Sequence, residues 1–227
     1  MFVCTEQEQL FLQTLTTTWY MAHKIEAATR DQSLGYEWHQ LRRPRITSSR
    51  FREVCHVRGE SSAANLADRI FRGTTQTAAM KRGLAMEAQA IRQYCQMKAV
   101  NFSPIGFCIH PECAFLGSSP DGLIFDPTES SPFGLVEIKS PNVKSYVDCS
   151  YVVLKGGQRK VNENHAYYWQ VQGQLLITGL DWCDFVVFAE DDMMIQRIYR
   201  DSATAKTIRE RADHFFFYHY MARVLKG

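Results

Sequence analysis

Glu137 and Lys139 form a carboxylate–amine pair separated by one apolar residue, Ile138, in the middle of the chain. The run around them is typical of a β-strand, in which successive side chains point to opposite faces. Glu137 and Lys139 therefore share one face, and Ile138 points from the other face into the core. A carboxylate beside an amine can orient a reactant and move a proton, which are tasks of a hydrolytic site.

Asp121 supplies a second carboxylate to the same place. Residues 123–125 and 135–138 are short apolar runs typical of strands, and the turn-rich segment 126–133 joins them. A hairpin is the simplest connection between them. Counting back from its turn places Asp121 almost opposite Glu137, so the two carboxylates and the lysine are predicted to converge at the open end of the hairpin.

Two carboxylates that meet in this way repel each other, and a cation that prefers oxygen ligands relieves the repulsion. We therefore expect Mg²⁺, with Mn²⁺ as a substitute, as one or two bound ions. Such an ion polarises a phosphodiester and lowers the pKa of water, while Lys139 orients or deprotonates the nucleophile. Glu87, on a preceding helix, is the candidate for a further carboxylate that binds a second ion or positions the attacking water.

Several helices are predicted before this hairpin. A capping box, Thr5 with Glu8, opens an amphipathic helix that we expect to run through Ala22. A short helix around Trp38 ends before Pro44. Three hydroxyl residues then offer caps for another helix: Thr47, Ser48 and Ser49. A long helix over Thr77–Lys98 follows, and its predicted buried face carries Leu84, Ala88, Ile91 and Cys95, with Glu87 beside it.

Beyond the hairpin the pattern predicts a helix, two strands and a terminal helix. In chain order they are His165–Thr178 ended by Gly179, Asp184–Ala189, Met194–Tyr199, and a helix capped by Ser202. Helices before the sheet and a helix between its later strands predict a mixed α/β (α+β) fold, with a central mixed β-sheet flanked by helices. A chain of 227 residues can bury one substantial core, so we expect a single domain over residues 1–227.

Composition limits the function classes. The formal net charge is +2, which carries no global sign of nucleic-acid binding, but five arginines lie between Arg42 and Arg52. This run can hold phosphate or form a solvated helix face. No glycine-rich nucleotide loop or serine-hydrolase elbow is present in the sequence. Seven scattered cysteines favour a reducing compartment, so we expect an intracellular protein of the cytoplasm or nucleus. The N-terminal residues do not resemble a leader and the apolar runs are short, so we expect neither secretion nor a membrane segment.

Six short motifs occur in one order along the chain: residues 38–42, 46–49, 83–87, 118–123, 137–141 and 167–172. Together they resemble the PD-(D/E)xK nuclease superfamily and, within it, the phage lambda exonuclease or YqaJ-type viral recombinase family. The resemblance covers roughly residues 36–200. It implies a restriction-endonuclease-like core with additional helices at both ends.

The resemblance implies roles for individual residues. Asp121 and Glu137 would be metal ligands together with the Ile138 carbonyl, and Lys139 would be the catalytic lysine. Glu87 would match the helix glutamate of the family. Gln170 would match the helix glutamine that holds the active-site water or backbone, with Tyr167 and Gln172 beside it.

A second site is also implied by the resemblance. Arg42, Ser49 and Ser119 match positions that form a pocket for the terminal 5′-phosphate, and arginine and hydroxyl groups are suitable anion donors. Ser48 departs from the small apolar residue that is usual there. Four further basic residues are candidate DNA contacts: Arg45, Lys155, Arg159 and Lys160. For the glycine-rich stretch 155–160, a solvated loop explains the sequence equally well.

The function implied is a metal-dependent 5′-to-3′ exonuclease that acts on double-stranded DNA ends, releases 5′-mononucleotides and leaves 3′ single strands for recombination or repair. A homo-oligomeric ring, a trimer in the family, and a single-strand annealing protein would be its partners. Two alternatives remain open: a structure-specific or nicking endonuclease with the same core, and a catalytically inactive DNA- or partner-binding protein.

Other chemistry-bearing residues have structural interpretations that we favour. Cys108, His110 and Cys113 match no standard zinc spacing. His165 is expected to cap a helix or lie at the surface. The aromatic block over residues 215–220 is expected to pack in the core or at an interface, because consecutive positions cover every face of a helix.

Overall fold

The chain folds around a five-stranded mixed β-sheet in the computed structural model, which describes residues 2–73 and 77–227. The strand order is β10-β9-β6-β5-β2; β6 pairs with β9 in parallel and the other pairs are antiparallel. The strands are β2 (Asn101–Ser103), β5 (Gly122–Phe125), β6 (Phe133–Lys139), β9 (Trp182–Phe188) and β10 (Met193–Tyr199). The expected mixed sheet and its hairpin are confirmed.

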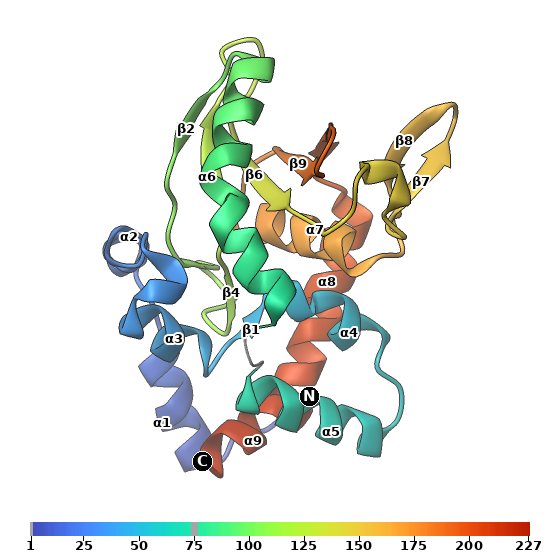
Figure 1. Cartoon of the computed structure of the whole chain (residues 1–227). Helices are drawn as coiled ribbons and strands as arrows, with labels where there is room; N and C mark the ends of the chain where they lie inside the picture. The colour runs from blue at the N-terminus through green and yellow to red at the C-terminus, as the bar shows by residue number, and fades with distance from the viewer. Residues whose placement is uncertain (1, 74–76) are drawn as a thin grey trace.

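Two small sheets accompany the main one. The first has the order β1-β4-β3, formed by Ile46–Thr47, Leu116–Ser118 and Cys108–Ile109. The second is a hairpin of β7 (Val152–Lys155) and β8 (Gln158–Val161). Figure 1 shows this hairpin projecting from the body of the molecule beside α7.

Helices make up most of the rest of the described chain. The α-helices are α1 (Glu6–Leu15), α2 (Trp19–Ala28), α3 (Tyr36–Arg42), α4 (Phe51–His56), α5 (Glu60–Arg72), α6 (Ala78–Lys98), α7 (Ala166–Thr178), α8 (Ser202–Phe215) and α9 (Met221–Leu225). Short 3₁₀ turns cover Gln32–Leu34, Ser48–Arg50 and Tyr146–Asp148, and Phe216–Tyr220 is a π-helical turn between α8 and α9. Among the described residues, no helix has both the length and the apolar composition to cross a bilayer.

Several details of the predicted elements are wrong. The opening helix is interrupted after Leu15, and Thr18 caps a separate helix α2. Thr47 precedes the 3₁₀ turn at Ser48 but its side chain makes no capping hydrogen bond, and Asp201, one residue before Ser202, caps α8. The stretch 155–160 is part of the β7–β8 hairpin, whose two turn glycines both have positive φ, as tight two-residue turns require.

The buried face of α6 also differs from the prediction. Ala90 and Tyr94 are fully buried, whereas Leu84 is exposed. The buried face is therefore one residue, or about 100°, away from the predicted one. Tyr94 decides this orientation because its hydroxyl donates a hydrogen bond of 2.6 Å to Asp184 in the sheet. As a result Glu87, seven residues before Tyr94, turns toward the sheet as well.

Asp184 is a fully buried carboxylate that ties α6 to β9 and β10. Arg197, directly opposite it on β10, donates to both of its carboxylate oxygens at 2.8 Å. The guanidinium group also lies 3.8 Å from the ring centroid of Trp182. Burial alone would lower the pKa of Arg197, but hydrogen bonds to Asp184, Asp126 and Glu129 raise it above its ordinary value. A buried charge needs this degree of pairing, so the network fixes where α6 lies on the sheet.

The two faces of the main sheet carry different helices. On one face α6 packs Ala90 and Tyr94 against a cluster that includes Val136 and Ile138. On the other face α7 packs Val171 and Leu175 against a cluster that includes Leu135 and Phe185. The alternation predicted for β6 is therefore confirmed, with Ile138 in the core on the α6 side.

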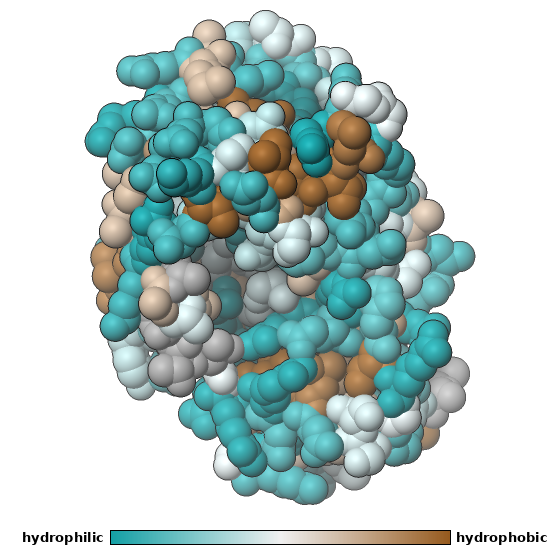
Figure 2. All heavy atoms as spheres, turned by 45° about the vertical axis from the view of Figure 1, so that its right-hand side comes forward, coloured by the Kyte–Doolittle hydropathy of each residue, from teal (hydrophilic) through white to brown (hydrophobic). Residues whose placement is uncertain are grey.

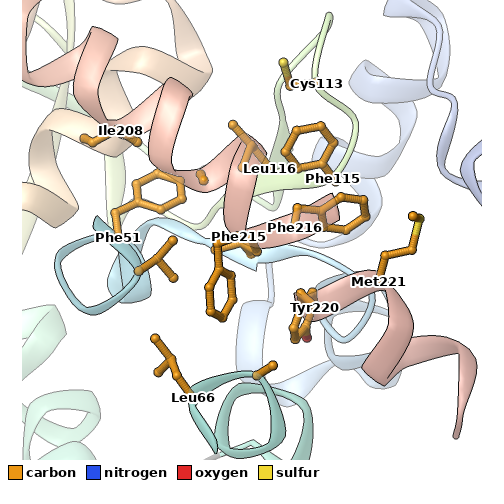
Figure 3. Packing of buried hydrophobic residues seen from close by; sticks show 14 of the residues in the cluster. Phe51, Leu66, Cys113, Phe115, Leu116, Ile208, Phe215, Phe216, Tyr220 and Met221 are labelled. Atoms are coloured by element: carbon orange, nitrogen blue, oxygen red, sulfur yellow. The ribbon is translucent and has the colours of Figure 1, made fainter. Parts of the chain in front are cut away.

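A third apolar cluster joins the terminal helices to α4, α5 and β4 (Figure 3). Phe115 stacks on Phe216 with ring centroids 4.3 Å apart, and Phe215 and Tyr220 are buried beside them. The core interpretation of the aromatic block is confirmed for these residues, whereas Tyr218 is exposed.

Gly173 allows α7 to approach α4 closely. A Cβ atom at this position would lie 2.2 Å from the ring of Phe51, which is fully buried. Gly173→Ala should therefore lower the free energy of unfolding by up to about 2 kcal/mol, because overpacking of about 1–3 kcal/mol outweighs the helix preference of about 1 kcal/mol for alanine.

Chemical denaturation measures this effect, and Gly83→Ala in α6 is the matched control. Nothing lies within 4 Å of a Cβ atom at Gly83, so alanine there should stabilise the protein by about 0.5–1 kcal/mol. Equal and stabilising effects at both glycines would contradict the close packing of α7 on α4.

Candidate functional site

The β5–β6 hairpin brings Asp121 and Glu137 together. Gly122 pairs with Val136, so Asp121 and Glu137 are the next pair along the same register. The Asp121 N–H donates to the Val136 carbonyl at 3.2 Å, and the Ile138 N–H donates to Asp121 Oδ2 at 2.6 Å. The predicted convergence is confirmed, and it is fixed by main-chain contacts on both sides of Asp121.

Glu137 is a buried carboxylate held by three donors. Its Oε1 accepts hydrogen bonds from Lys139 Nζ at 2.5 Å and from Gln170 Nε2 at 2.7 Å. Its Oε2 accepts one from Gln174 Nε2 at 2.6 Å. Helix α7 thus presents two glutamines, one turn apart, to a single carboxylate.

Gln174 was missed by the sequence interpretation. Its spacing of four residues from Gln170 places both amides on one face of α7, and this spacing was the available signal. Gln172 belongs to the opposite side of the helix. Its amide donates to the Tyr199 carbonyl and accepts from the Asp201 N–H, so it joins α7 to the segment before α8.

Lys139 lies between Glu137 and an aromatic ring. Its Nζ is 4.5 Å from the ring centroid of Tyr167, at the start of α7. Burial alone would lower the pKa of Lys139, but the charges of Glu137 and Asp121 outweigh this effect and raise it above its ordinary value. Lys139 is therefore a cation in this structure, fixed by one ion pair and one cation–π contact.

For Asp121, in contrast to Lys139, the surroundings disfavour the charged form. Burial and the neighbouring charge of Glu137 raise its pKa well above the ordinary value. Only Oδ2 accepts a hydrogen bond from the described residues, which leaves Oδ1 without a donor. A carboxylate with raised pKa and one open oxygen, beside a second carboxylate, has the donor chemistry that suits a hard cation.

Glu87 lies near this pair without contacting it. It is half-buried on α6, and burial and the charge of Glu137 raise its pKa. Among the described residues no hydrogen bond joins Glu87 to Asp121 or Glu137, and no three His, Cys, Asp or Glu side chains form a ready-made metal cage. The site is therefore built from two carboxylates, with Glu87 at its margin.

A second constellation surrounds Arg42, at the end of α3. Arg42 Nη1 donates to Ser119 Oγ at 3.1 Å, and Trp38 Nε1 donates to the same oxygen at 2.8 Å. The guanidinium carbon lies 4.0 Å from the Trp38 ring centroid. Burial and the charge of Arg50 lower the pKa of Arg42 to about 10. Within the described chain no carboxylate pairs with Arg42, so this desolvated cation is available to bind an anion.

The side chains of two other residues predicted to contact phosphate or DNA, Ser49 and Arg45, form no hydrogen bond with Arg42 or Ser119 in the described structure. Ser49 is exposed, and the hydrogen bond of its hydroxyl is to Thr47 at 3.3 Å, so no contact joins it to Arg42 or Ser119 in the described structure. The predicted DNA contact at Arg45 is wrong. Arg45 is buried and donates to the carbonyls of Ala114, Leu41 and Leu15. Its donors are used within the fold, and burial lowers its pKa to about 10.

The basic residues of the β7–β8 hairpin are at the surface. Lys155 pairs with Glu163 at 2.9 Å, and Arg159 is exposed. Lys160 is half-buried, opposite Val153 in the hairpin register. These three residues are accessible to a ligand, as their predicted DNA contact requires.

Two histidines serve as acceptors for main-chain N–H groups. His165 caps α7 through a hydrogen bond from the Tyr167 N–H to Nδ1. His110 Nδ1 accepts from the N–H groups of Glu112 and Cys113 at 3.1 Å. The interpretation of His165 as a helix cap is thus confirmed, and His110 Nδ1 is occupied by main-chain donors.

Replacing Gln174 with leucine removes one donor from Glu137 and keeps the approximate volume of the side chain. Hydrogen bonds that orient a ligand carboxylate are worth about 10- to 100-fold in activity. We expect the phosphodiester hydrolysis predicted from the sequence to slow by that factor in Gln174→Leu, as measured in single-turnover assays.

Gln172→Leu is the matched control on the same helix. It removes contacts to Tyr199 and Asp201, so it should lower stability while leaving the rate per folded molecule unchanged. A rate for Gln174→Leu equal to that of the control would show that Glu137 does not depend on Gln174.

The chain is similar to a known protein family and to several proteins of known structure. A family model described as the YqaJ-like viral recombinase domain matches residues 37–181. An alkaline exonuclease from Laribacter hongkongensis is similar over 85% of this chain and 97% of its own, with 29% identity and a TM-score of 0.64. The same exonuclease in complex with dAMP gives a TM-score of 0.65, with the same identity and coverage.

A more distant neighbour shares the fold. The shutoff and exonuclease protein from Kaposi's sarcoma-associated herpesvirus is similar over 87% of this chain and 71% of its own, with 15% identity and a TM-score of 0.55. No curated protein matches the chain by sequence. The structural neighbours place the mixed sheet and its flanking helices in the restriction-endonuclease-like fold.

Proposed function

The chain belongs to the YqaJ-like viral recombinase domain family, and on that basis we propose that it is a metal-dependent exonuclease. It degrades double-stranded DNA from the 5′ end, releases 5′-mononucleotides and leaves a 3′ single strand. The observation that carries the proposal is the convergence of Asp121, Glu137 and Lys139 at the end of β6. The similar exonuclease from Laribacter hongkongensis binds dAMP, a deoxynucleoside monophosphate of the kind expected as product.

A divalent cation, Mg²⁺ in our proposal, fits the oxygen donors of the site. Asp121 and Glu137 would hold it with the Ile138 carbonyl, and Glu87 would complete the surroundings of one or two ions. The open oxygen of Asp121 and its raised pKa support this fit. When bound, the cation would supply positive charge against which the phosphodiester develops negative charge.

The protein side chains carry the remaining tasks. Lys139 is a fixed cation next to the carboxylates, so it orients the attacking water and stabilises negative charge on the phosphate. Gln170 and Gln174 hold Glu137 by both of its oxygens, which keeps the carboxylate from turning away during the reaction. The bond between phosphorus and the 3′-oxygen breaks as the bond to the water oxygen forms. The released nucleotide keeps its own 5′-phosphate and gains a 3′-hydroxyl, and the shortened strand begins with a new 5′-phosphate.

The direction of digestion depends on Arg42. A terminal 5′-phosphate carries more negative charge than an internal phosphodiester, and a desolvated guanidinium group discriminates between them. Trp38 and Ser119 fix the guanidinium from two sides. We place the 5′-phosphate against Arg42 and Ser119, while Ser49 stays a predicted but unsupported member of the pocket.

Linear and circular substrates test the proposal. With Mg²⁺, the protein should release labelled mononucleotides from the 5′ end of a linear duplex and leave a covalently closed circle intact. Cutting of the closed circle at a comparable rate would show an endonuclease instead. Absence of hydrolysis from both substrates would favour an inactive DNA-binding descendant. The ring assembly and the annealing partner stay predictions from the family resemblance.

A further inference from the structure

A basic groove runs between α4 and α5, and we propose that it holds the single-stranded 3′ tail that the exonuclease leaves behind. This inference rests on the proposed function and names where the second strand of the substrate goes. The groove has a volume of about 470 Å³. Its polar lining residues are Arg52, Glu53 and His56 from α4 and Ser62, Asn65 and Arg69 from α5.

The charge of the groove favours a polyanion. Glu53 is its one acidic lining residue, and two arginines share it, Arg69 from α5 and Arg50 at 2.9 Å. Arg52 donates to a main-chain carbonyl, that of Asn164, so this contact leaves its positive charge uncompensated. The lining therefore has surplus positive charge, as grooves that follow a nucleic-acid backbone do.

The size and polarity of the groove favour one strand over two. A volume of about 470 Å³ falls within the 300–1,000 Å³ of ordinary small-ligand pockets. That volume matches about one or two nucleotides of a single strand. The side chains of Ser62 and Asn65 are exposed and make no hydrogen bond in the described structure, so both can bind phosphate or base edges.

The groove lies next to the candidate active site. In Figure 1, α4 lies between α7 and α5. His56, in the groove, contacts the ring of Trp169 edge to face at 4.7 Å, and the next residue, Gln170, binds Glu137. Figure 2, which brings this side of the molecule forward, shows a hollow between its upper and lower parts. The groove and the candidate active site are therefore joined through two consecutive residues of α7, Trp169 and Gln170.

The groove is also connected to the Arg42 pocket. Arg50 is close enough to Arg42 to contribute to its lowered pKa, and it binds Glu53, which bridges to Arg69. Positive charge thus continues from the proposed 5′-phosphate pocket along α4 to α5. Separating the two strands at this point would send the 5′ end to Arg42 and the other strand toward Arg69.

The DNA-binding affinity of Arg69→Ala tests this assignment. It is measured in EDTA, so that no strand is cut. Two duplexes with 5′-phosphates are compared, one blunt and one with a 3′ single-stranded tail of about 12 nucleotides, within the span of known single-strand sites. In the unaltered protein the tail should tighten binding. In Arg69→Ala, loss of one phosphate contact should reduce the slope of log affinity against log salt by about 0.7, or about fivefold over one decade of salt.

Two further variants keep the result interpretable. Arg69→Lys retains the point charge and should retain the salt dependence. Arg200→Ala removes an exposed arginine that is paired with Asp181 at 3.0 Å, near the β5–β6 turn at the other end of β6. This control should bind both duplexes like the unaltered protein.

The possible results distinguish binding of the single-stranded tail in the groove from hydrolysis at the candidate active site. If the gain in affinity from the 3′ tail is unchanged in Arg69→Ala, the assignment is overturned. An equal loss of affinity for blunt and tailed duplexes would also overturn it, since the groove would then hold duplex DNA. A tail-specific loss supports it. Hydrolysis is measured separately, so failure of the nuclease proposal would appear as an inactive protein with normal tail binding.

Discussion

Hydrolysis of a 5′-phosphorylated duplex is expected to fall by at least about 10³-fold when Asp121 is replaced by asparagine. The substitution removes the charge of one proposed metal ligand, and electrostatic stabilisation of this kind is worth several kcal/mol in a dry site. The asparagine oxygen can still accept the hydrogen bond from the Ile138 N–H. The hairpin should therefore keep its geometry while the chemistry is lost.

Single-turnover release of labelled mononucleotide measures this effect, together with a thermal melt and an affinity measurement for DNA. Because the neutral amide in Asp121→Asn would no longer repel Glu137, the melting temperature should be unchanged or higher. Asp148→Asn, which alters an exposed aspartate in a 3₁₀ turn, is the control and should react normally. A folded Asp121→Asn protein with more than about a tenth of the original rate would be inconsistent with metal ligation by Asp121.

Arg42→Ala should remove the preference for 5′-phosphorylated ends. Losing one partner of a buried charged contact costs about 2–5 kcal/mol, so we expect the ratio of kcat/KM between 5′-phosphate and 5′-hydroxyl ends to fall by about 100-fold. Arg42 has no carboxylate partner in the described chain, so its removal leaves no unpaired buried acid and should cost little stability.

Two comparisons make the Arg42 result specific. Arg42→Lys keeps the charge but loses the planar fork, and should retain part of the preference. Arg45→Ala should destabilise the fold, since three carbonyls lose their donor, and leave the end preference intact. If the unaltered protein degrades both kinds of end at one rate, Arg42 does not read the 5′-phosphate and the direction of digestion loses its support.

The hairpin and its three chemical residues could be predicted because they depend on local pattern. Strand alternation assigns the faces of Glu137 and Ile138, and counting from one turn gives the register of Asp121. The same reasoning predicts the ends of α7, where His165 and Gly179 are local capping signals. These features need no information from distant parts of the chain.

Features that depend on distant partners could not be predicted. Arg42 and Arg45 look alike in sequence, but Arg45 is buried against the carbonyls of Leu15 and Ala114. The pattern of α6 alone does not give its buried face, because Tyr94 binds Asp184, 90 residues along the chain. The spacing of Gln174 from Gln170 gives its face of α7 but not its partner, because Glu137 lies on another element.

The most direct measurement of the central claim is the release of nucleotides from a 5′-end-labelled duplex by the unaltered protein, Asp121→Asn and Lys139→Ala, in Mg²⁺ and in EDTA. Only the unaltered protein with Mg²⁺ should release labelled 5′-mononucleotide, and EDTA should abolish the release. Equal release in EDTA, or by either folded variant, would contradict a metal-dependent site built on Asp121, Glu137 and Lys139.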